Sequence, residues 1–168
     1  FIMKKTLKIA AVAVAIFAIL AALSLLYTYM KLQKVNLSVV NAKLYKESEI
    51  TDVFEAAEDH TIYVFVYDSE NEDCIYLDEV MLRQISNENG EIHFDEIYKI
   101  NYKDSSSTYN NQIIKNLYSI ESIPAIVKVK KLDSGYDILD TFEWSANTKT
   151  DIENLTAFLK RNELIPVN

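Results

Sequence analysis

Glycine, cysteine and histidine are scarce in this 168-residue sequence, which has two glycines, one cysteine and two histidines. Loops that cradle nucleotide phosphates need several glycines close together. Gly90 and Gly135 stand apart, so nucleotide binding through such a loop is excluded. A lone cysteine, Cys74, excludes an internal disulfide bond and a cysteine-based zinc cluster. Because His60, His93 and Cys74 match no metal-ligand spacing, we expect neither a metal nor a cofactor.

Acidic side chains dominate all but the amino-terminal part of the chain, although the net charge of the whole is only −8. Residues 1–34 hold five of the 17 basic residues and no acid. This leaves 12 basic and 25 acidic side chains in residues 35–168, a balance of −13. A surface of this sign repels the phosphate backbone of nucleic acids, so we exclude nucleic acid as a partner.

An apolar run near the amino terminus is long enough to cross a membrane. Residues 9–30 reach about 33 Å as a helix, against roughly 30 Å of hydrocarbon. Tyr27 and Tyr29 stand at the end of the run, where aromatic rings prefer the headgroup level. The preceding lysines favour a cytoplasmic tail, residues 1–8, which predicts a single-pass protein of the cell membrane with its carboxy-terminal domain outside. The alternatives are a cleaved signal peptide, for which the run is too long and lacks a clear cleavage site, and a buried helix of a soluble protein.

Residues 31–46 follow this run as a stalk, whose part from residue 35 onward is also a candidate first strand. Beyond the stalk, the hydrophobic periodicity alternates between the patterns of helices and strands. The predicted helices are residues 50–57, 74–85, 109–117 and 150–159, and the predicted strands are residues 61–67, 92–102, 125–132 and 136–143. The order β-α-β-α-β-α-β-β-α predicts an α/β fold with a mixed sheet flanked by helices, in which a carboxy-terminal hairpin precedes the last helix.

Three segments, taken in this order, resemble the thioredoxin fold. Val64–Tyr67, followed by a short loop and a cysteine-led helix, is similar to the strand that delivers the family's Cys-x-x-Cys motif. Ile97–Asn101 is similar to the family's Lys-Leu-Asn strand, and Tyr118–Lys130, with its Ile-Pro pair, is similar to the Ile-Pro-Thr segment. The resemblance implies that residues 47–168 form a thioredoxin-like domain. It also implies that the bond before Pro124 is cis and that this proline lies against the active site.

The redox motif of the thioredoxin family is incomplete in this chain. In the ungapped register, residues 71–74 (Asn-Glu-Asp-Cys) occupy the Cys-x-x-Cys positions, so Asn71 replaces the attacking cysteine. A shift of three residues would instead make Cys74 the attacking thiol, without a partner. The positions of the family's tryptophan, buried acid and lysine hold Tyr67, Phe65 and Lys99. With one sulfur, a dithiol cycle within one chain is impossible.

Three interpretations of Cys74 are open: a small buried side chain on a helix face, which we favour, a reactive single thiol, and an intermolecular disulfide. Carboxylates near Cys74 in the sequence oppose a thiolate by more than the helix dipole favours it. They are Glu70, Glu72, Asp73, Asp78 and Glu79. Because the first four of these acids lack the spacing of a calcium-binding loop, we interpret those four as a solvated acidic segment rather than a calcium site.

These features predict a membrane-tethered, extracytoplasmic thioredoxin-like protein that binds a partner protein or peptide without dithiol redox catalysis. The predicted binding groove consists of Asn71, Cys74, Tyr67, Ile123, Pro124 and Trp144. Trp144 either closes this groove or covers the edge of the core. The alternative function is thiol-disulfide exchange through Cys74 alone or with a second protein. Residues 71–74 also resemble the Cys-Pro-Asp-Cys of bacteriocin-transport accessory proteins from Gram-positive bacteria, a source of which the Lys, Asn, Ile, Glu and Tyr bias is typical.

Overall fold

The computed structural model describes residues 18–25, 37–103 and 108–167 of the chain. The chain divides into two compact units, residues 1–36 and residues 37–168. The second unit contains the sheet, the hydrophobic core and all of the predicted site residues.

Residues 18–25 of the first unit are helical, and their side chains are exposed. In the part of the chain that the structure describes, no helix combines the length and the apolar character that a membrane span requires. The predicted tail, residues 1–8, and most of the predicted anchor, residues 9–30, lie outside the described residues. The membrane anchor therefore stays a prediction.

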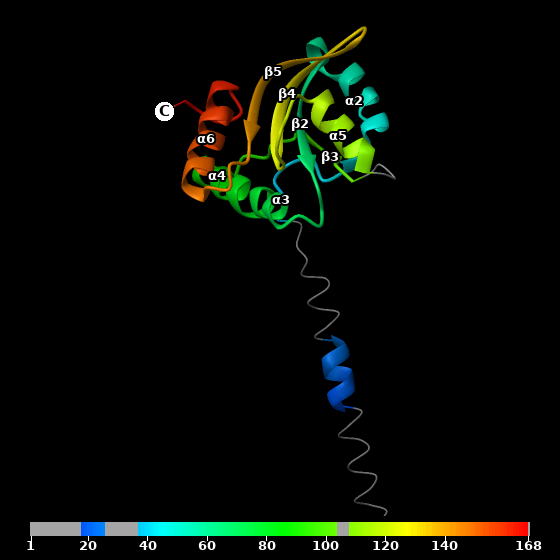
Figure 1. Ribbon diagram of the computed structural model, residues 1–168. Helices are drawn as coiled ribbons and strands as arrows, with labels where there is room; N and C mark the ends of the chain where they lie inside the picture. The colour runs from blue at the N-terminus through cyan, green and yellow to red at the C-terminus, as the bar shows by residue number, and fades with distance from the viewer. Residues whose placement is uncertain (1–17, 26–36, 104–107, 168) are drawn as a thin grey trace, which may run out of the picture. The chain divides into compact units, whose positions relative to one another are not determined.

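A five-stranded mixed sheet forms the centre of the second unit (Figure 1). Its strands are β1 (Leu44–Tyr45), β2 (Thr61–Tyr67), β3 (Ile97–Asn101), β4 (Ala125–Leu132) and β5 (Gly135–Glu143). They lie in the order β1-β3-β2-β4-β5. Strands β1 and β2 are parallel to β3, whereas β4 is antiparallel to both β2 and β5. Strand β2 is thus the central strand, as its apolar sequence predicts.

Helices cover both faces of the sheet (Figure 1). One face is covered by α3 (Glu72–Tyr76), the π-helical turn η3 (Leu77–Met81), α4 (Leu82–Glu88) and α6 (Thr148–Arg161), and the other by α2 (Thr51–Ala56) and α5 (Thr108–Leu117). The short 3₁₀ turns η1 (Glu47–Glu49) and η2 (Glu58–His60) flank α2. The order of elements is the predicted one, except that α3, η3 and α4 in succession replace the single helix expected over residues 74–85.

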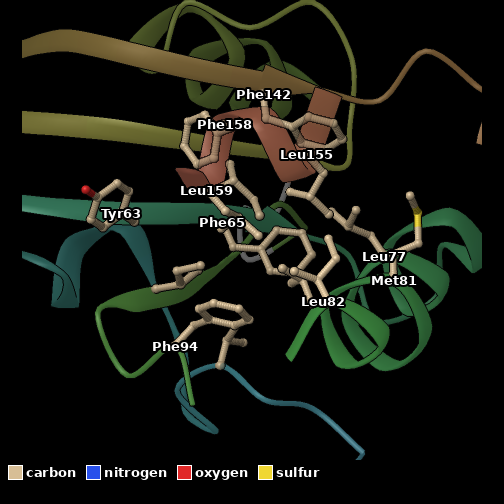
Figure 2. Close-up of a cluster of buried hydrophobic side chains, with 14 of the residues drawn as sticks. Tyr63, Phe65, Leu77, Met81, Leu82, Phe94, Phe142, Leu155, Phe158 and Leu159 are labelled. Atoms are coloured by element: carbon tan, nitrogen blue, oxygen red, sulfur yellow. The ribbon is translucent and has the colours of Figure 1, made fainter. Parts of the chain in front are cut away.

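Two hydrophobic clusters, one on each face of β2, hold these layers together. Alternation along the strand directs Phe65 into the cluster beneath α3, α4 and α6 (Figure 2). Val64 and Val66 point into the cluster beneath α2 and α5. All three side chains are 0% exposed. Complete burial of a side chain such as Phe65 contributes about 1.5–3 kcal/mol, so this position stabilises the core in the place where the thioredoxin family has an acid.

The domain begins earlier in the chain than the predicted boundary at residue 47. Val40 forms a parallel bridge with Phe94, and the two residues of β1 pair with β3. Because Val40 is 2% exposed, it belongs to the core rather than to a solvated linker. Residues 37–45 are therefore part of the domain, and the candidate first strand takes the place of the later part of the predicted stalk, residues 31–46.

The order and directions of the strands are those of the thioredoxin-like α/β fold, with a mixed sheet flanked by helices. The carboxy-terminal hairpin, β4 and β5, precedes α6 as expected. The peptide bond between Ile123 and Pro124 is cis, as the resemblance implied. These observations confirm the predicted fold class for the second unit.

Candidate functional site

The predicted groove residues gather at the end of the sheet where β2 ends. The loop after Tyr67 leads directly into α3, which carries Cys74. The antiparallel pairing of β2 with the start of β4 places Pro124 beside the same strand end. The N–H of Trp144 donates to the carbonyl of Pro124 at 3.0 Å, which brings the residue after β5 to this place as well. Three distant parts of the sequence thus meet here.

Asn71 caps helix α3 and supplies no nucleophile. Its Oδ1 accepts a hydrogen bond from the backbone N–H of Cys74 at 3.1 Å, which satisfies one of the free donors at the helix start. Glu72 and Asp73 in the first turn complement the helix dipole. In the ungapped register, an amide therefore occupies the position of the attacking sulfur, and it cannot attack a disulfide.

Cys74 is buried in the hydrophobic cluster beneath α3, with 0% of its surface exposed. The pKa of its thiol rises from 9.0 to about 12, chiefly because burial disfavours the thiolate. A hydrogen bond with the backbone of Asp68 opposes this rise, whereas the charges of Asp68, Asp73 and Asp78 add to it. Because the thiolate is the form that attacks disulfides, the neutral thiol at pH 7 is a poor nucleophile. This geometry agrees with the interpretation of Cys74 as a small buried side chain.

A buried ion pair that the sequence patterns did not indicate lies one helical turn beyond Cys74. The Nζ of Lys99 is 2.8 Å from Asp78 Oδ2. The Ser38 hydroxyl donates to Asp78 Oδ1 at 2.6 Å, and Lys99 Nζ donates to Ser38 Oγ at 3.2 Å. The thioredoxin family has its buried acid on the central strand, where this chain has Phe65. In this chain, the carboxylate that pairs with Lys99 belongs to Asp78 of η3 instead.

The burial of Asp78 corrects the interpretation of the acidic segment as uniformly solvated. Glu70, Glu72 and Asp73 are exposed, but Asp78 is only 2% exposed. It follows Cys74 by four residues, so both side chains lie on the same face of the helical segment. That spacing was the one signal in the sequence that could have placed Asp78 inside the domain.

Glu143, which the sequence patterns also did not indicate, fixes the loop before β4. Its Oε2 accepts hydrogen bonds from the backbone N–H groups of Glu121 and Ser122 at 2.9 and 3.0 Å, and from the Ser122 hydroxyl at 3.2 Å. Among the described residues, no hydrogen bond uses the backbone of Ile123, which immediately precedes Pro124. The loop is thus held in place, and the N–H and C=O of the half-buried Ile123 have no hydrogen-bond partner in the described part of the chain.

Trp144 packs against the core and against Tyr76, a residue that the sequence patterns did not indicate. The two rings meet edge-on, with centroids 6.2 Å apart and an interplanar angle of 68°. Trp144 also adjoins the cluster around Phe65. Tyr76 and Val80, one helical turn apart, are 38% and 45% exposed. Trp144 therefore covers the edge of the core and at the same time borders an exposed aromatic ring.

Half of the predicted groove residues do not reach the surface. Cys74, Tyr67 and Pro124 are buried, whereas Asn71, Ile123 and Trp144 are half-buried. Burial raises the pKa of Tyr67 to about 12, and Lys99 Nζ lies 5.1 Å from the centroid of its ring. The apolar side chains at this end of the sheet that are not buried form what we call the Trp144 surface, which consists of the exposed Tyr76 and Val80 and the half-buried Ile123 and Trp144.

No family model and no curated protein matches this sequence. Several solved structures are similar. A thioredoxin of Trichomonas vaginalis is 20% identical, with 70% of this chain and 98% of that chain covered and a TM-score of 0.41. The germline-specific thioredoxin Deadhead of Drosophila melanogaster is 18% identical, with 71% and 99% covered and a TM-score of 0.43. A protein described as DsbH oxidoreductase is 14% identical, with 72% and 91% covered and a TM-score of 0.39. Similarities with identities and TM-scores this low do not indicate a function. The fold assignment therefore rests on the order and directions of the strands.

Proposed function

We propose that the second unit binds an extended segment of a partner protein or peptide at the Trp144 surface, without dithiol redox catalysis. We also propose that residues 9–30 anchor the chain in the cell membrane and hold this unit on the extracytoplasmic side. The observation that carries the first proposal is a contrast within one site: the thiol of Cys74 is 0% exposed, while Tyr76 beside it is 38% exposed.

Disulfide exchange requires a thiolate that a substrate sulfur can reach. Cys74 meets neither condition, because it is fully buried and its pKa is about 12. Asn71 serves as a helix cap in the place of a second sulfur. These features weigh against the alternative function, an oxidoreductase that works through Cys74 alone or with a second protein. Some similar structures are described as thioredoxins or as an oxidoreductase, but the sulfur chemistry behind those names is not available to this chain alone.

The Trp144 surface has the properties of a peptide-binding site. Tyr76 and Trp144 offer large rigid rings, which bind a partner at a low cost in conformational entropy. Beside them, the backbone of Ile123 can pair with an extended chain in the manner of an added strand. Because Glu143 already holds this loop in place, little ordering is required on binding. We propose an exported peptide or protein as the partner, as in the bacteriocin-transport accessory type that residues 71–74 resemble.

Selection of peptides on the full chain tests this proposal. Random peptides displayed on phage are selected on the full chain in detergent micelles, and the Kd of an enriched peptide is measured by fluorescence anisotropy. Tyr76→Ala and Trp144→Ala are each expected to raise the Kd roughly thirtyfold, because aromatic hot spots contribute at least about 2 kcal/mol.

Leu139→Ala on β5 is the matched control for these variants, because Leu139 is 47% exposed and lies outside the site. We expect it to leave the Kd unchanged. The proposal fails if neither aromatic variant weakens binding, or if Leu139→Ala weakens it as much as they do.

A further inference from the structure

A groove lies on the α2 side of the sheet. Its first part is a cavity of about 480 Å³ between β1, α2 and β3. Its second part, of about 340 Å³, lies at the amino ends of β2 and β3. Ala57 and Tyr98 line both parts, so the two cavities adjoin, and we call them together the β1–α2 groove. Each volume falls within the range of roughly 300–1,000 Å³ that ligand sites occupy.

This groove is separate from the Trp144 surface. Thr61 begins β2 and Glu96 precedes β3, and both line the second part of the groove. The Trp144 surface, in contrast, lies where β2 ends. The two places share no residue, so a ligand of one does not need the other.

Two tyrosine rings form part of the wall of the β1–α2 groove. Tyr45 and Tyr98 meet edge-on, with centroids 6.0 Å apart and an interplanar angle of 74°. The Nζ of Lys43, which also lines the groove, lies 4.2 Å from the centroid of the Tyr45 ring. An ammonium group of the chain itself therefore already sits on this aromatic wall. Aromatic faces attract cations because of their quadrupole, so a further cation fits the Tyr98 ring rather than the Tyr45 ring, which Lys43 occupies.

Carboxylates line the same groove. Asp52 lines its first part, and Glu58 and Glu96 line its second part. All three are exposed, and none of them takes part in an ion pair between described residues. The pKa of Tyr98 is raised, first by burial and then by its neighbours Tyr45, Glu96 and Asp95, so the negative charges of the groove also act on this tyrosine.

From these observations we infer that the β1–α2 groove binds a short cationic peptide segment that carries two or more lysine or arginine side chains. Charge complementarity selects this occupant, because a basic side chain can lie against Tyr98 while the next one pairs with Glu58 or Glu96. Residues 35–168 carry a charge balance of −13, which disfavours binding of a second copy of this domain or of an anionic surface. The inference goes beyond the proposed function, since it concerns a different face and a different ligand chemistry.

Fluorescence anisotropy with a designed probe tests this inference. The full chain in detergent micelles is titrated against a labelled octapeptide of alternating lysine and serine, and the glutamate–serine octapeptide serves as the matched probe. Glu58→Gln/Glu96→Gln is expected to raise the Kd for the lysine peptide roughly fivefold, by the loss of two exposed ion pairs. Tyr98→Leu is expected to raise it roughly two- to fivefold, by the loss of a cation–π contact. Salt raised from about 50 to about 500 mM is expected to weaken binding by screening.

The control variant Glu91→Gln/Glu153→Gln removes the same charge from exposed carboxylates outside the groove. An equal loss of affinity in this variant, or a comparable loss in Trp144→Ala, would overturn the inference, because the attraction would then be diffuse or lie at the other surface. Failure to bind the lysine peptide at low salt, or equal binding of the glutamate peptide, would overturn it as well. Tighter binding by Lys31→Gln/Lys34→Gln would identify the chain's own preceding segment as the occupant and likewise contradict the inference. Circular dichroism checks the folding of each variant.

Discussion

The rate at which an alkylating reagent modifies Cys74 measures how far the surroundings of this thiol lower its reactivity. Cys74 is the only cysteine, so iodoacetamide reports on it alone. The rise in its pKa from 9.0 to about 12 lowers the thiolate fraction at pH 7 about 1,000-fold, from roughly 10⁻² to roughly 10⁻⁵. A more basic thiolate is a better nucleophile, which recovers a factor of about 15 to 30 for a Brønsted coefficient of about 0.4–0.5. The net expectation is a rate about 30- to 60-fold below that of an ordinary thiol.

Burial slows the reaction further, because the reagent must wait for local opening around a side chain that is 0% exposed. The assay follows the loss of free thiol in the full chain in detergent micelles at pH 7, with glutathione and the urea-unfolded chain as references. We expect the folded chain to react at least about thirtyfold more slowly than either reference. We also expect its rate to continue rising beyond about pH 10. A rate within about threefold of the unfolded chain, or a plateau below about pH 8, would refute this reasoning and favour the oxidoreductase alternative.

Three further variants test other parts of the structure. Lys99→Met leaves Asp78 buried without its cation, so it is expected to lower the free energy of unfolding by about 3–5 kcal/mol in urea denaturation. The double variant Asp78→Leu/Lys99→Met is expected to recover most of this loss. Equal losses of stability in the two variants would contradict the buried pair. Glu143→Ala removes the acceptor that fixes the cis-proline loop, so amide exchange in that loop is expected to accelerate about tenfold, and an unchanged rate would exclude the role we give it. Burial opposes ionisation of Asp140, but hydrogen bonds and the charge of Arg161 lower its pKa below 3.8 overall. A carboxyl group with a lowered pKa in the folded state stabilises the fold at pH values above its unfolded pKa, and this stabilisation is lost as the pH falls through its folded pKa. Asp140→Asn is therefore expected to lose less stability than the unmodified chain between about pH 5 and pH 2. Identical losses of stability in the two acid titrations would contradict this.

The central layer of the domain could be predicted because its signals are local. Strand β2 is apolar on both faces, and the Ile-Pro pair at Pro124 precedes a β-branched strand. The turn at Gly135 marks the hairpin of β4 and β5. The burial of Cys74 could also be predicted, from its place on an apolar helix face. Strand β1, by contrast, has two residues, too few to show a periodicity, so the boundary of the domain was placed too late.

The polar contacts at the site could not be predicted, because they join residues that are far apart in the sequence. Ser38, Asp78 and Lys99 meet only when the segment before β1, the π-helical turn η3 and strand β3 have packed together. Glu143 reaches a loop that precedes it by about twenty residues, across the β4–β5 hairpin. Tyr76 likewise could not be assigned to the site from the sequence, because only the fold brings its ring into contact with Trp144, which follows β5. Spacing along the chain carries no information on such pairs until the strand order is known.

The central claim is that this site binds its partner through the exposed ring of Tyr76 and the half-buried ring of Trp144, and not through its thiol. The affinity of Cys74→Ala for the peptide selected on the full chain tests this most directly, because alanine removes the sulfur and leaves the Trp144 surface unchanged. We predict a Kd within about twofold of the unmodified chain for Cys74→Ala, against a roughly thirtyfold rise for Tyr76→Ala. A folded Cys74→Ala chain that no longer binds the peptide, while Tyr76→Ala still does, would contradict the claim.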